Sequence, residues 1–153
     1  MGRNRKGARD SLYYYKWLDK ALQDLQAARI LLTWGGDAPN IAFHCQQAIE
    51  KALKGYLLFR TGRHFDGDSL TYLCRQAVQV DEAFTQWLEE SALLNNLYIE
   101  TRYPTDLPLH LDERTVRRYL NMAEDLFAAI RQDLYEGGMP HRIKSRRSDN
   151  KKQ

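Results

Sequence analysis

The sequence has few of the residues from which metal centres and disulfide scaffolds are built. It contains two cysteines, Cys45 and Cys74, and four histidines in 153 residues. No CxxC or HExxH motif occurs and no two histidines lie one helical turn apart, so we expect neither a metal site nor another cofactor. Both cysteines fall within apolar helical patterns. We therefore expect reduced core thiols in a cytoplasmic protein.

Long apolar runs are also missing. No stretch reaches the ~18 apolar residues that a membrane span needs, and the opening MGRNRKGARD lacks the apolar segment of a signal peptide. A glycine-rich phosphate loop, a hydrolase serine elbow and a cysteine-protease arrangement are absent from the sequence as well. We therefore expect no membrane partner and none of the enzyme classes that these motifs mark.

The net charge of +3 hides a division between the ends and the body of the chain. Residues 1–10 and 136–153 together carry ten lysines and arginines against three acids, so the remaining body is acidic overall. We expect a disordered basic N-terminal arm over residues 1–10 and a disordered basic C-terminal tail over residues 138–153. These ends act either as solubilising segments or as electrostatic arms for RNA or DNA.

The stretch from Ile41 to Phe59, IAFHCQQAIEKALKGYLLF, is the element around which the rest is organised. Its apolar residues recur at steps of three and four, which predicts a helix with one wide apolar face. The opposite side carries a polar ridge at helical spacing, which consists of His44, Gln47, Lys51 and Lys54. A helix with so wide an apolar face needs partner helices, and its coverage also predicts a homodimer.

Four more segments have apolar residues at helical spacing. They cover residues 11–34, residues 70–80, a segment capped by Asp81 and a segment capped by Asp112 that Gly137 ends. In the first, the residues expected to face inward include Tyr15, Leu18, Leu22, Leu25 and Leu32. In the last they are Val116, Leu120, Ala123, Phe127, Ile130 and Leu134. The sequence predicts an all-α protein, an up-and-down antiparallel bundle of about five helices over residues 11–137.

One short polar segment combines residue types that act on phosphates. Glu100, Arg102 and Tyr103 precede Pro104, and His110 lies six residues beyond that proline. Arginine forks onto phosphate oxygens, and histidine can move a proton to or from a 2′-hydroxyl or a leaving oxygen. The alternative is structural: an Arg–Glu pair that ties down a helix end, with a loop histidine in solvent. Spacing alone favours the structural alternative.

The polar ridge formed by His44, Gln47, Lys51 and Lys54 has the same two interpretations. Charged helix surfaces are solvated by default and need no function. As a recognition surface, the ridge would offer positive charge and amide donors to a nucleotide or a partner protein.

The residues of two segments resemble the HEPN domain family. The run from Phe43 to Lys54, FHCQQAIEKALK, is similar to the family's second helix, and the run from Trp17 to Ala28, WLDKALQDLQAA, resembles its opening helix. Arg102-Tyr103-Pro104 looks like the end of its fourth helix. The resemblance spans residues 15–134 and implies a HEPN-like bundle that usually dimerises.

The resemblance also implies a function and a setting. Many HEPN proteins are metal-independent ribonucleases with an arginine followed four to six residues later by a histidine, and many are paired with a minimal nucleotidyltransferase in a toxin–antitoxin system. Here seven residues separate Arg102 from His110, which is longer than that motif. We expect an RNA- or nucleotide-binding protein in which Arg102 binds the scissile phosphate, His110 is the general acid/base and Glu100 orients Arg102. The alternative is a non-catalytic helical module that docks the nucleotidyltransferase.

Overall fold

A computed structural model of the chain describes residues 13–102 and 111–136. These residues form five α-helices and one 3-10 helix, and the described ranges contain no strand, which confirms the predicted fold class. The helices are α2 (Tyr14–Thr33), α3 (Ala38–Thr61), α4 (Leu70–Val80), η2 (Glu82–Trp87), α5 (Leu88–Arg102) and α6 (Glu113–Tyr135). The arms predicted at residues 1–10 and 138–153 lie outside the described residues.

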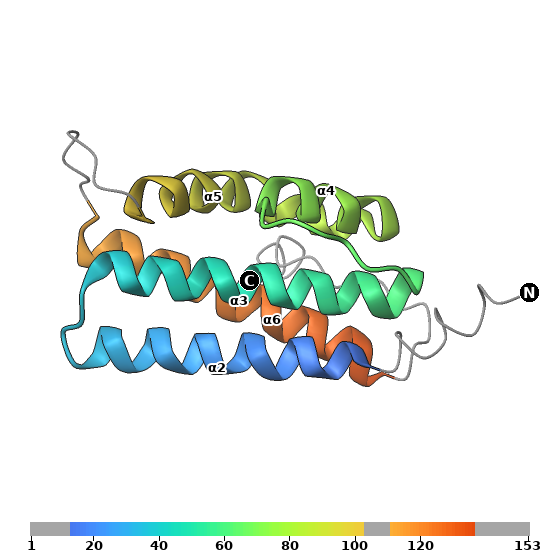
Figure 1. The fold of residues 1–153 in the computed structure, drawn as a ribbon, viewed down its shortest axis with the longest axis horizontal. Helices are drawn as coiled ribbons and strands as arrows, with labels where there is room; N and C mark the ends of the chain where they lie inside the picture. Colours follow the sequence, from blue (N-terminus) through green and yellow to red (C-terminus); the bar gives the residue numbers. More distant parts are fainter. Residues whose placement is uncertain (1–12, 103–110, 137–153) are drawn as a thin grey trace, which may run out of the picture.

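Helices α2 and α3 run antiparallel and form the most extensively packed pair (Figure 1). Gly35, at a φ of 73°, makes the turn between them, and Pro39 stands in the first turn of α3, where its missing N–H costs nothing. Gly62 ends α3 in the left-handed region at a φ of 70°, and its N–H reaches the carbonyl of Leu58. Both ends of α3 therefore carry local signals in the sequence.

Helices α4 and α5 lie on the other side of α3 from α2 (Figure 1). Ser69 caps α4 by accepting a hydrogen bond from the backbone of Tyr72, and Asp81 caps the next element through the backbone of Ala83. That element is not the single helix that the sequence predicted. Its first six residues form the 3-10 helix η2, and α5 begins only at Leu88.

Helix α6 returns along the back of α3 and crosses from the end of α5 towards the start of α2 (Figure 1). Asp112 caps it, with Oδ1 2.7 Å from the backbone nitrogen of Thr115. All six residues predicted to face inward on this helix are buried. The final helix therefore follows its amphipathic pattern closely.

The core is built around α3, which contacts α2, α4, α5 and α6. Apart from Phe43, its apolar residues from Ile41 to Leu58 are almost fully buried within the chain itself. The wide apolar face from which a homodimer was predicted is therefore covered by the protein's own helices. Gly55 permits the close approach of α2, because a Cβ there would lie 3.0 Å from the Cβ of Trp17.

Two residues of α2 depart from the predicted inward face. Tyr15 is 48% exposed and Leu22 is 38% exposed, whereas Leu25 and Leu32 are buried as expected. Ala21 and Ala28 are fully buried on the same helix, and small side chains of this kind let two helices approach closely. Within the described ranges, no helix has the length and hydrophobicity to cross a membrane.

Candidate nucleic-acid interface

The polar ridge of α3 faces a carboxylate on α2. Asp24 accepts from Lys51, with 2.6 Å between Nζ and Oδ2, and its Oδ1 lies 3.0 Å from Nδ1 of His44. The Asp24 side chain is 12% exposed, and those of Lys51 and His44 are 24% and 29% exposed. Asp24 therefore ties two positions of the ridge to the neighbouring helix. Sequence reasoning missed this acid, although it stands within the segment that resembles the family's opening helix.

The remaining ridge residues also have partners inside the chain. Lys54 lies over the ring of Trp17 and 3.8 Å from Oε1 of Glu50, while Gln47 donates to the amide oxygen of Gln46. Gln46 is itself buried and donates to the backbone carbonyl of Asp68. The ridge is therefore a partly buried polar seam in which acids accompany the cations, and not an open cationic surface.

Burial dominates the ionisation of Glu50 in this seam. Desolvation raises the pKa of its carboxyl above the usual value, against the attraction of Lys54, and the nearby charge of Asp68 adds to the rise. A carboxylate that is held in this way destabilises the folded state when it is charged. This seam therefore shows the energetic cost of packing charged groups between helices.

The segment predicted to act on phosphates begins at the end of α5. Glu100 and Arg102 belong to the last turn of this helix, and Arg102 is its final residue. Tyr103 and His110 lie outside the described residues. The convergence of Arg102 and His110 on one phosphate therefore stays a prediction.

Sequence reasoning also missed a group of three arginines on α6. Arg114, Arg117 and Arg118 line a cavity of about 500 Å³ between α6 and the η2–α5 segment, together with Trp87 and Asn121. They stand in the first two turns of α6, at the end of the bundle where α5 finishes (Figure 1). The spacing RTVRR was the available signal, since positions 114, 117 and 118 share one helical face.

The acids near these arginines differ in exposure: Glu113 lies in solvent, whereas Glu90, whose side chain is 30% exposed, lines the same cavity as the arginines, together with Asp125. Arg117 pairs with Glu113 at 2.9 Å, with side chains 52% and 73% exposed, and Arg118 lies 3.6 Å from Glu90. Exposed ion pairs of this kind contribute little and are readily exchanged for another anion. The three guanidinium groups can therefore bind phosphate oxygens.

Comparisons with known proteins identify the family. The HEPN domain matches residues 14–133, which is most of the chain, and the chain belongs to the HEPN domain family. The resemblance read from the sequence is thereby confirmed. Membership supports a helical module of a nucleotide- or RNA-related kind.

Among solved structures, the chain is similar to the protein TT1696 from Thermus thermophilus. The two share 30% sequence identity with a TM-score of 0.67, and the match covers 78% of this chain and 97% of that one. A search of curated proteins finds no match. The structural match therefore extends over almost the whole of TT1696.

Proposed function

We propose that the protein is a HEPN-type RNA- or nucleotide-binding protein and one half of a toxin–antitoxin pair. The supporting observation is the group of three arginines on α6 that lines one cavity. Arg102 ends α5, and Arg114, Arg117 and Arg118 occupy the first two turns of α6. A guanidinium donates two parallel hydrogen bonds to phosphate oxygens and keeps its charge at any physiological pH. Several neighbouring guanidinium groups can therefore bind successive phosphates of an RNA backbone.

Within this proposal the protein cleaves RNA without a metal. Arg102 binds the scissile phosphate and stabilises the charge of the phosphorane, while Glu100 orients Arg102. His110 acts as the general acid/base that moves a proton at the 2′-hydroxyl or the leaving oxygen. Tyr103 contributes to binding beside Arg102.

A ribonuclease assay tests this assignment. We expect cleavage of a single-stranded RNA by the wild type to fall by at least about 100-fold in Arg102→Ala and in His110→Ala, because each loses a group that acts in the transition state. His64→Ala, in the connector before α4, is the matched control and should retain full activity. Cleavage that neither Arg102→Ala nor His110→Ala alters would show that these residues are not catalytic.

One observation favours the alternative function, a non-catalytic module that docks a nucleotidyltransferase. The ridge cations Lys51 and Lys54 already lie beside Asp24 and Glu50, so the seam presents nearly balanced charge and amides. Such a surface suits a protein partner better than a polyanion. Co-purification with a minimal nucleotidyltransferase, lost in Gln47→Glu and kept in Arg117→Ala, together with no cleavage of RNA, would establish this function instead.

We also propose that the protein is a homodimer. Because the apolar face of α3 is covered within the chain, two copies do not meet through that face.

A further inference from the structure

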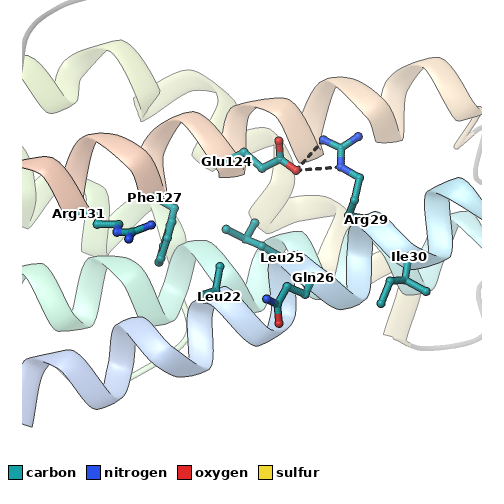
Figure 2. Close-up of a pocket in the computed structure, with 8 residues that line it drawn as sticks. All are labelled: Leu22, Leu25, Gln26, Arg29, Ile30, Glu124, Phe127 and Arg131. Carbon is teal, nitrogen blue, oxygen red and sulfur yellow. Dashed lines mark hydrogen bonds and ion pairs between the residues drawn. The ribbon is translucent and has the colours of Figure 1, made fainter.

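An apolar hollow lies on the outside of the bundle, between α2 and α6. Its volume is about 580 Å³, which falls in the range of sites that bind small molecules. Figure 2 shows its lining residues converging from the two helices. The hollow takes no part in the RNA-binding site proposed above, which uses the end of α5 and the first two turns of α6.

The apolar walls of the hollow combine buried and exposed residues. Leu25 and Phe127 are buried, whereas Leu22 is 38% exposed and Ile30 is 59% exposed. A single exposed leucine or isoleucine is ordinary, but two that line one concavity together with buried apolar residues are typical of a binding groove. A ligand with a hydrocarbon chain would remove this surface from water, which favours its binding.

The charges at the hollow are unequal. Its lining includes two arginines, Arg29 and Arg131, and one acid, Glu124. Arg29 donates from Nε and Nη2 to Oε1 of Glu124, at 3.0 and 2.6 Å, so these two charges neutralise each other (Figure 2). Arg131 is exposed, and among the residues that the structure describes no acidic side chain pairs with it. One guanidinium at the hollow is therefore available for an anion.

The order of these groups along the hollow describes a ligand. In the view of Figure 2, Arg131 lies at one end, and Leu22 and Leu25 lie between it and the Arg29–Glu124 pair. Glu124 and Arg131 are seven residues apart on α6, which is about 10 Å along the helix. A molecule with a negative head group and a hydrocarbon chain of medium length matches this order. Its head group meets a guanidinium, which binds a carboxylate through two parallel hydrogen bonds, and its chain lies along the leucines.

We propose that the hollow between α2 and α6 binds a small amphiphilic carboxylate, of which a medium-chain fatty acid is the simplest example. Arg131 binds the carboxylate, and the hydrocarbon chain is buried against Leu22, Leu25 and Ile30. Because Arg131 is exposed, the carboxylate keeps part of its hydration, and the ion pair offsets the part that it loses. This site does not depend on the RNA-binding function proposed above.

Isothermal titration calorimetry of the full protein with decanoate, well below the concentration at which decanoate forms micelles, tests the role of charge. We expect one decanoate to bind saturably, and Arg131→Gln to weaken its binding at least about 10-fold, because the variant loses a charge-assisted ion pair. Arg75→Gln, which replaces an exposed arginine on α4, is the matched control and should bind decanoate as the wild type does.

Decyltrimethylammonium has a hydrocarbon chain of the same length and a head group of opposite charge. We expect it to bind the wild type at least about 10-fold more weakly than decanoate. Absence of saturable decanoate binding, equal binding of decanoate by the wild type and Arg131→Gln, or equal binding of the two amphiphiles would each overturn the proposal.

A second pair of variants tests the location of the site. Leu22→Glu places a carboxylate in the wall of the hollow and should weaken decanoate binding at least about 10-fold, whereas Leu93→Glu, at a comparably exposed leucine on α5, should not. Glutamate is a good helix former, so both variants should keep the circular dichroism spectrum of the wild type. If Leu22→Glu left decanoate binding intact and changed the sedimentation of the protein, the face would belong to a contact with a second polypeptide, and the proposal would be overturned.

Discussion

Replacing Asp24 by asparagine tests whether the polar ridge of α3 is a structural seam. The substitution keeps the size of the side chain and removes the charge that Lys51 and His44 share, at 2.6 and 3.0 Å. A hydrogen bond to a charged group contributes about 1.5–3 kcal/mol when both partners are shielded from water. Because the side chains of Lys51 and His44 are about a quarter exposed, hydration recovers part of this loss. We expect the free energy of unfolding to fall by about 2 kcal/mol in total.

Urea denaturation followed by circular dichroism measures this change, and the melting temperature should fall by about 4–8 °C. A double-mutant cycle with Lys51→Met should give a coupling energy of about 1 kcal/mol or more. Asp19→Asn, an exposed acid on the same helix, is the control and should change stability by less than about 0.5 kcal/mol. An equally small effect of Asp24→Asn would refute the structural role of the seam. Lys51 and His44 would then be available as an open binding surface.

Three further predictions concern buried groups. Because burial raises the pKa of Glu50, the charged carboxylate destabilises the folded protein above its ordinary pKa. In urea denaturation at pH 7, Glu50→Gln should therefore be more stable than the wild type. The difference in the free energy of unfolding between the two proteins should shrink towards acid pH. Burial raises the pKa of Cys45 to about 12 and that of Cys74 to about 11, so neither thiol should react with a disulfide reagent at pH 8 until the protein unfolds. The buried hydroxyl of Tyr56 finds no hydrogen-bond partner among the described residues, so Tyr56→Phe should hold or raise the melting temperature; a fall of several degrees would reveal a partner.

The sequence predicted the helices well because their signals are local. The caps Ser69 and Asp112, the glycine that ends α3 and the apolar period of α6 each act through neighbouring backbone, so they can be recognised without knowledge of the rest of the molecule. The 3-10 turn before α5 was missed because Asp81 caps either kind of helix in the same way.

The environment of the candidate site was harder to predict because it depends on which helices meet. Asp24 precedes Lys51 by 27 residues, and nothing in the spacing shows that the turn between α2 and α3 brings them together. Hydrophobic period alone also cannot separate a residue that faces the core from one that stays on the surface. Tyr15 and Leu22 satisfy the period and still lie on the surface.

The salt dependence of RNA binding tests the arginine-rich end of the bundle most directly. Each phosphate contact on a single strand contributes about 0.7 to the slope of log affinity against log salt concentration. When Arg114, Arg117 and Arg118 are replaced together by alanine, we therefore expect the slope for a single-stranded RNA, followed by fluorescence anisotropy, to decrease in magnitude by about 2. Arg75→Ala should leave it unchanged. An identical slope in the wild type and the triple variant would contradict the account.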